Sequence, residues 1–186
     1  MKDELTSLPG FTKGLLNEKK NEIVARNARG VFLETLESLA KKDKKVILIV
    51  GDVGFSYMQI FQKKYPKQFI NAGITEQSFM GIAAGLAKSG FKPYVYSMIP
   101  FVLMRNYEQL RNDVCYNNAN VKLVGATGNI HYRFQGMSHN LMGKENEEDL
   151  LKNLPNIKRY YPKNTDQVHN IVLETYKNTK PTYIRL

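Results

Sequence analysis

Glu76 stands directly before a nearly charge-free run of small and apolar residues, in the stretch "NAGITEQSFMGIAAGLAKSG" at 71–90. If Glu76 lies in the first turn of a helix, the helix dipole favours its anion by about 0.3–1 kcal/mol, and the role of Glu76 is structural. If Glu76 instead faces a pocket, desolvation favours its protonated form, which can exchange a proton with a bound molecule. The pattern alone does not decide between a structural acid and a catalytic one.

Three further stretches place reactive or aromatic side chains after expected buried strands. Asp52 follows "VILIVG", Phe101 follows "KPYVYSMIP", and a long loop, "TGNIHYRFQGMSHNLMG" at 127–143, follows "VKLVGA". Long loops in compact domains are more often functional than decorative. Because ligands of parallel sheets bind beyond the carboxyl ends of the strands, we expect a site at this edge.

The elements that position these residues are strands alternating with helices. The run "VILIV" at 46–50 is typical of a strand buried on both faces, and "ARGVFLETLESLAKK" at 28–42 has apolar residues at helical spacing. Such alternation favours right-handed crossovers and helices on both faces of a sheet. We predict an α/β fold, a three-layer domain with a mostly parallel central sheet of about six strands.

The segment after Glu76 is expected to be a buried helix. Thr75 is its predicted cap, and Gly90 its predicted end. Its predicted buried face follows the i, i+3, i+4, i+7, i+8 pattern and comprises Phe79, Ile82, Ala83, Leu86 and Ala87.

The chain divides into a short arm and one domain. Residues 1–28 are polar and mixed in charge, which is typical of an arm or linker, and residues 29–186 are long enough for one domain with a substantial core. We see no apolar signal-peptide core and no run of transmembrane length. The single cysteine fits a reducing compartment, so we expect a soluble cytoplasmic protein with no membrane partner.

The formal net charge of +10 comes from lysines that alternate with acids, as on solvated helix faces. A nucleic-acid binder would more often concentrate arginine with aromatics or contain a known module, and none is visible. We therefore expect no nucleic-acid partner, and a basic surface suited to an acidic partner or a phosphorylated substrate.

Several ordered motifs together resemble one enzyme family. "GITEQSFMGIAAGLA" resembles the segment that carries the essential glutamate in the pyrimidine-binding domain of transketolases and 1-deoxyxylulose-5-phosphate synthases. The resemblance continues through "PFVLMRNYEQLRNDVCYNNANVKLVG", with its aromatic and R-x-x-E-Q helix, then "QGMSHN", "LPNIKRYYP" and "KPTYIRL". It covers about residues 29–186, and it changes the interpretation of Glu76 from a structural acid to a catalytic one.

The resemblance implies thiamine-diphosphate chemistry. In this family the glutamate shares a proton with a ring nitrogen of the cofactor's aminopyrimidine, which activates the thiazolium carbon to take a two-carbon unit from a ketose phosphate. Such a glutamate must be able to hold a proton, so desolvation must outweigh the helix dipole.

The resemblance also suggests roles for other residues. Phe101 matches the aromatic on which the aminopyrimidine stacks, and Asp52 matches an acid near the thiazolium side. His139, in "GMSHN", matches the histidine of a G-x-[ST]-H motif that reaches substrate. From the residues alone, Phe101 fits a core position, Asp52 a helix cap and His139 a hydrogen-bonded loop residue equally well.

Three substrate-side positions depart from the family pattern. Thr127 stands where transketolases usually have a histidine near the donor sugar, and Phe134 and Gln135 replace an acidic pair. A group that pairs with a substrate hydroxyl cannot become Phe without changing which hydroxyls are satisfied. We expect the cofactor end to be retained and the sugar end altered.

The diphosphate-binding half of the family is not recognisable. "GDVG" at 51–54 lacks the second glycine of the family's G-D-G motif and its following asparagine, so we assign no metal ligand. We expect either a fragment or a subunit of a split enzyme, whose partner chain holds most of the magnesium and diphosphate. The expected assembly is a homodimer or heterotetramer.

Three alternatives remain open. A β-type subunit of a 2-oxo-acid dehydrogenase shares the domain and the glutamate, although "RNYEQLRND" and "GMSHN" look more like the transketolase branch. A 1-deoxyxylulose-5-phosphate synthase-like enzyme is the second. A non-catalytic interaction module is the third, and the presence of both Glu76 and Phe101 argues against it.

Overall fold

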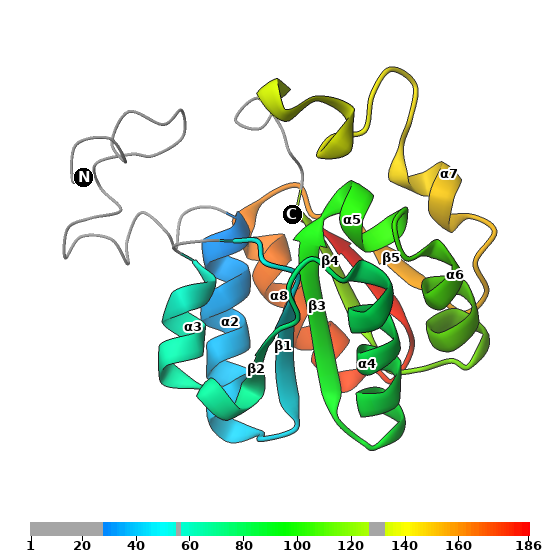
Figure 1. Ribbon diagram of the computed structural model, residues 1–186. Helices are drawn as coiled ribbons and strands as arrows, with labels where there is room; N and C mark the ends of the chain where they lie inside the picture. The colour runs from blue at the N-terminus through cyan, green and yellow to red at the C-terminus, as the bar shows by residue number, and fades with distance from the viewer. Residues whose placement is uncertain (1–27, 55–56, 127–132) are drawn as a thin grey trace, which may run out of the picture.

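The computed structural model describes residues 28–54, 57–126 and 133–186. The predicted α/β fold is confirmed, with a central sheet of six strands in the order β2-β1-β3-β4-β6-β5. Every pair of neighbouring strands in this sheet is parallel (Figure 1). The strands are β1 (Val46–Val50), β2 (Phe69–Asn71), β3 (Lys92–Met98), β4 (Lys122–Ala126), β5 (Lys158–Tyr160) and β6 (Thr182–Arg185).

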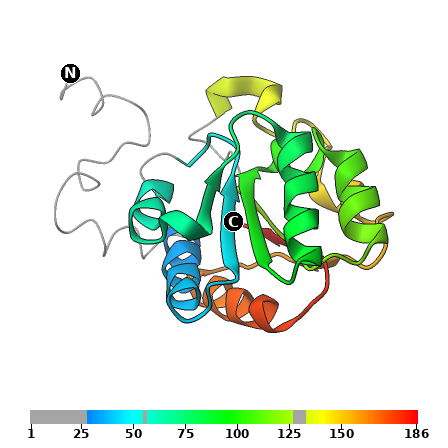
Figure 2. The ribbon, with the colours of Figure 1, turned by 60° about the horizontal axis from the view of Figure 1, so that its bottom comes forward.

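The helices form a layer on each face of the sheet (Figure 2). They are α2 (Ala28–Lys42), α3 (Met58–Lys64), α4 (Glu76–Lys88), α5 (Ile99–Leu103), α6 (Tyr107–Gln109), α7 (Glu147–Leu151) and α8 (Thr165–Lys177). A π-helical turn, Leu110–Tyr116, extends α6. The predicted arm falls almost entirely outside the described residues, and α2 begins at Ala28, the last residue that we assigned to the arm.

Alternating side chains of the central strands β1, β3 and β4 contribute to two hydrophobic clusters. In β1, Ile47 and Ile49 pack with α4 and α5, whereas Val46, Leu48 and Val50 pack with α2, α3 and α8. All five residues of β1 are buried, which confirms the prediction of a strand covered on both faces. This strand is therefore packed between the two helix layers, and its carboxyl end lies at the edge where we expect the site.

The helix α4 is confirmed, but the predicted buried face is partly wrong. Its buried apolar residues are Phe79, Met80, Ala83 and Ala84, whereas Ile82 is 44% exposed. The difference arises because α4 packs against the π-helical turn as well as against β3, which rotates the buried face. As predicted, Gly90 ends the helix: its φ is +84°, and its N–H donates to the carbonyl of Ala87.

The start of α4 is positioned by a close approach and a turn. A Cβ at Gly51 would lie 2.7 Å from a ring carbon of Phe79, so only glycine lets α4 come this near to the end of β1. Thr75 occupies the predicted N-cap position of α4, but its side chain makes no capping hydrogen bond. Its hydroxyl donates instead to the carbonyl of Ala72 at 2.7 Å, and so closes the turn that leads into Glu76.

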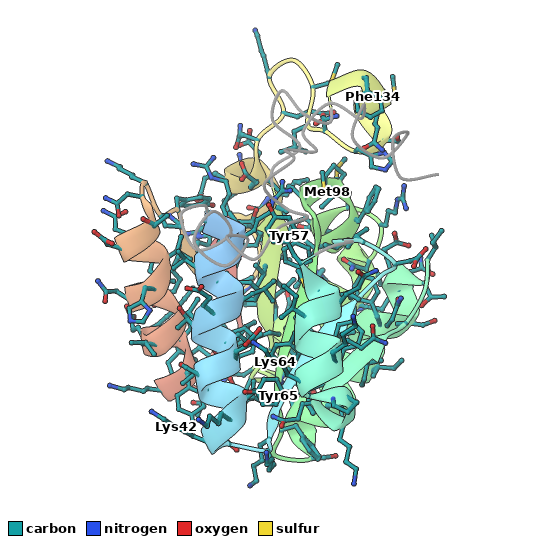
Figure 3. All side chains as sticks on the ribbon, turned by 90° about the vertical axis from the view of Figure 1, so that its left-hand side faces the viewer. Lys42, Tyr57, Lys64, Tyr65, Met98 and Phe134 are labelled. Carbon is teal, nitrogen blue, oxygen red and sulfur yellow. The ribbon has the colours of Figure 1, made fainter. Side chains whose placement is uncertain are left out.

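Lysines gather at the amino edge of the sheet, away from the carboxyl ends of the strands. Lys41 and Lys42 end α2, and Lys88 and Lys177 end α4 and α8, where the helix dipole favours a cation. Lys42 lies at the bottom of Figure 3, and Phe134 lies at the top of the molecule. These lysines therefore do not face the carboxyl edge, where we expect ligands to bind.

Candidate functional site

Glu76 begins α4 and is buried, with 8% of its surface exposed. Its Oε1 accepts a hydrogen bond from Arg105 Nη1 at 2.7 Å, and the two side chains form an ion pair. Asn106 is fully buried, and its Nδ2 donates to the Glu76 carbonyl at 3.3 Å. The residues after α5 therefore hold both the side chain and the backbone of Glu76.

Arg105 joins Glu76 to Phe101. Its guanidinium carbon lies 3.7 Å from the centroid of the Phe101 ring, at the distance of a cation–π contact. Phe101 belongs to the cluster that contains α2 and α8, and only 5% of it is exposed. The predicted aromatic residue therefore does lie beside the predicted acid, with Arg105 between them.

His139 completes the group. Its ring lies 4.7 Å from that of Phe101, centroid to centroid, at an interplanar angle of 67°. Desolvation, together with the positive charge of Arg105, lowers the pKa of His139 below its ordinary value and so favours the neutral imidazole. We call Glu76, Phe101, Arg105 and His139 the Glu76 cluster. Three of its four members were predicted site residues.

Arg105 was missed by the sequence analysis. It lies in the R-x-x-E-Q segment directly after the predicted aromatic, so a signal was present, but the pattern does not show what the guanidinium contacts. The ion pair joins residues 29 positions apart in the chain. The fold makes it by placing the start of α4 beside the end of α5.

The other predicted residues lie at different distances from this group. Gln135 is in the short 3₁₀ segment Arg133–Ser138, next to His139, and its Oε1 is buried without a hydrogen-bond partner among the described residues. Phe134 is 74% exposed, which suits a residue that meets substrate or another chain. Thr127 lies outside the described residues.

Asp52 is placed at the end of β1 but not within the Glu76 cluster. Its φ is +54°, and its N–H donates to Asn71 Oδ1 at 3.1 Å. Asn71 Oδ1 also accepts from the N–H of Gly73 at 3.0 Å, so this amide ties β1 to the turn before α4. The contacts of Asp52 are those of a turn residue, and its role at a cofactor stays a prediction.

The Glu76 cluster suits a flat, protonatable ring. Arg105, a planar cation, already makes two such contacts: it pairs with the carboxylate of Glu76 and lies over the ring of Phe101. An aminopyrimidine needs the same two contacts, so the residues fit this part of thiamine diphosphate. Among the described residues, no group of three or more His, Cys, Asp or Glu could hold a metal ion. No described helix is long and apolar enough to cross a membrane.

Comparison with known families agrees with this geometry. Residues 25–186 match the model described as "Transketolase, pyrimidine binding domain". The chain therefore belongs to the transketolase pyrimidine-binding-domain family, and the resemblance inferred from its motifs is confirmed.

Two curated relatives are subunits or sections of transketolases. One subunit of the apulose-4-phosphate transketolase of Phocaeicola vulgatus is 32% identical over 89% of this chain and 52% of that protein. The putative transketolase C-terminal section of Methanocaldococcus jannaschii is 31% identical over 88% of this chain and 51% of that protein. The chain thus spans about half the length of these relatives.

A solved structure shares both fold and sequence. It is described as "Split gene transketolase, inactive beta4 tetramer" and has a TM-score of 0.72 and 31% identity, over 86% of this chain and 50% of that one. The chain is therefore similar to about half of a protein described as a split-gene transketolase.

Proposed function

We propose that this chain is the pyrimidine-binding subunit, or part of it, of a thiamine-diphosphate-dependent transketolase-like enzyme of carbohydrate metabolism in the cytoplasm. The enzyme transfers a two-carbon ketol unit between sugar phosphates. The observation that carries the proposal is the Glu76 cluster, in which a buried carboxylate and an aromatic ring are bridged by a planar cation. Family membership supports it.

Each member of the cluster has a distinct task. The cofactor, when bound, supplies a carbon nucleophile. Glu76 holds or releases a proton at Oε2, the oxygen for which the described residues supply no hydrogen-bond partner. Phe101 positions the aminopyrimidine by stacking, so Arg105 must leave part of the ring face that it covers. His139 reaches the sugar, and its neutral imidazole can accept a hydrogen bond from a hydroxyl.

The partner chain supplies what this chain lacks. We propose that a second subunit carries the diphosphate site and most of the magnesium ligands. The expected assembly is a homodimer or a heterotetramer. Family relatives described as subunits support this arrangement. The exposed Phe134 and Met137, beside His139, are suited to being covered in such a complex. We propose neither a nucleic-acid nor a membrane partner.

The sugar differs from that of ordinary pentose-phosphate transketolases. Thr127, Phe134 and Gln135 replace a histidine and two acids of the family pattern, so different substrate hydroxyls are satisfied. The buried, unpartnered Oε1 of Gln135 is an acceptor that a substrate hydroxyl could fill. The Phocaeicola relative is named for apulose 4-phosphate, so this sugar phosphate belongs among the donors to be tested.

The experiment is a donor panel on the chain reconstituted with its partner subunit, thiamine diphosphate and magnesium. We expect two-carbon transfer from a ketose phosphate to an aldose phosphate, faster with apulose 4-phosphate than with xylulose 5-phosphate. Oxidative decarboxylation of a 2-oxo acid would instead identify a dehydrogenase β-type subunit. Release of carbon dioxide from pyruvate, with condensation onto an aldose phosphate, would identify a 1-deoxyxylulose-5-phosphate synthase-like enzyme.

A further inference from the structure

The hydroxyl of Ser138 contacts both a carbonyl oxygen and the imidazole ring of His139. Ser138 Oγ lies 3.0 Å from the carbonyl oxygen of Gln135 and 2.8 Å from His139 Nδ1. A carbonyl oxygen can only accept, so this contact is a hydrogen bond when the single hydroxyl proton of Ser138 points to Gln135. The contact with Nδ1 is then a hydrogen bond only if Nδ1 is the donor.

We propose that Ser138 is a positioning residue that fixes His139 as the Nδ1–H tautomer, so that Nε2 presents a lone pair to a substrate hydroxyl. The assignment of the tautomer stands on geometry alone. The identity of the hydroxyl as that of the sugar rests on the proposed function.

The surroundings of the imidazole support a fixed orientation. The N–H of His139 donates to the carbonyl of Gly136 at 3.3 Å, and Asn140 Nδ2 donates to the same oxygen at 2.9 Å. Gly136 itself has a φ of +62°, a conformation that L side chains rarely adopt. This turn, together with the ring of Phe101, limits rotation of the imidazole.

Burial, together with the positive charge of Arg105, lowers the pKa of His139 and so favours the neutral ring. Arg105 is the charged group whose field acts on the imidazole, and its own partner is the carboxylate of Glu76. A neutral imidazole has one donor nitrogen and one acceptor nitrogen. The hydrogen bond of the His139 ring within the described residues is made by Nδ1, and no described residue hydrogen-bonds to Nε2. In the Nδ1–H tautomer, the lone pair of Nε2 is therefore available to a ligand.

His169 provides an internal reference. Its Nδ1 lies 2.9 Å from Thr35 Oγ1, whose hydroxyl donates to the carbonyl of Val31 at 2.7 Å. The same reasoning assigns the Nδ1–H tautomer to His169, but this residue lies in α8 against α2, among residues that belong to neither the cluster nor the 3₁₀ segment. Changes at Ser138 should therefore leave the signals of His169 unchanged.

The test is the ¹⁵N spectrum of the histidine rings in the full chain, without cofactor or partner, for the wild type, Ser138→Ala and Ser138→Thr. We expect a protonated Nδ1 and an unprotonated Nε2 for His139 in the wild type. Ser138→Ala should move a large part of the population to the Nε2–H tautomer, and Ser138→Thr, which keeps the hydroxyl, should restore the wild-type pattern. Ser138 is exposed, so neither variant should unfold the chain.

Two results would overturn the assignment: an Nε2–H tautomer in the wild type, or a Ser138→Ala spectrum like that of the wild type. In the reconstituted enzyme, Ser138→Ala should lower kcat/KM for the donor sugar about 3- to 10-fold, the equivalent of one neutral hydrogen bond, and Ser138→Thr should restore it. The spectra need no substrate. They therefore test the tautomer of His139 even if the reconstituted enzyme shows no ketol transfer. A correct tautomer with an unchanged kcat/KM would reject the proposed sugar contact.

Discussion

Replacing Glu76 with glutamine should lower turnover of the assembled enzyme by about 10²–10⁴-fold, the usual contribution of general acid–base catalysis. Glutamine keeps the size of the side chain and one acceptor oxygen, so it can still accept from Arg105. It cannot gain or lose a proton at Oε2, which is the task that we propose for Glu76. The measurement is ketol transfer by the reconstituted pair under saturating cofactor.

The control for this variant is thermal melting of the chain alone. The loss of the ion pair leaves Arg105 without its carboxylate, but that side chain is 39% exposed and can be solvated by water. We therefore expect folding and partner binding to be nearly unchanged. Activity within a few-fold of the wild type would mean that Glu76 is only a helix-start acid.

Substitutions at Phe101 should separate packing from stacking. Phe101→Ala removes the ring of a residue that is only 5% exposed, and this class of change costs about 3–5 kcal/mol of folding stability. It should also weaken cofactor retention by about 1–3 kcal/mol, by analogy with the stacking of bases on aromatic rings. Urea unfolding of the chain and cofactor titration of the reconstituted pair measure the two effects.

Phe101→Leu is the matched control. Leucine keeps an apolar side chain in the core, so the folding loss should fall to about 1 kcal/mol, but it offers no aromatic face. Cofactor retention should therefore drop nearly as far as in Phe101→Ala. If Phe101→Leu retained the cofactor as well as the wild type, Phe101 would be a core residue without a role in stacking.

Much of the fold was predictable because each element carries its own pattern. The buried run of β1 and the glycine that ends α4 depend on neighbours close in the chain, and both predictions are confirmed. The exposed Ile82 was not predictable, because the buried face of α4 depends on a π-helical turn that packs from a distant part of the chain. Local periodicity cannot report such a contact.

The candidate site shows the same division. Motif resemblance selected Glu76, Phe101 and His139, and the structure brings these three together. The sequence analysis missed Arg105 because only the packed fold creates its two contacts, one with a carboxylate and one with a ring. The sequence analysis also missed the hydroxyl of Ser138, because the role that we propose for it depends on which acceptor its single proton faces.

The most direct test of the central claim, that this chain needs a partner to hold thiamine diphosphate, is calorimetry of the cofactor and magnesium with the purified chain. We predict no saturable binding in the micromolar range for the chain alone, because the contacts that we propose for Phe101 and Glu76 reach only the aminopyrimidine end. We predict saturable binding once the partner subunit is added. Magnesium-dependent binding by the chain alone with a Kd of about 1 μM, equivalent to about −8 kcal/mol, would contradict the account.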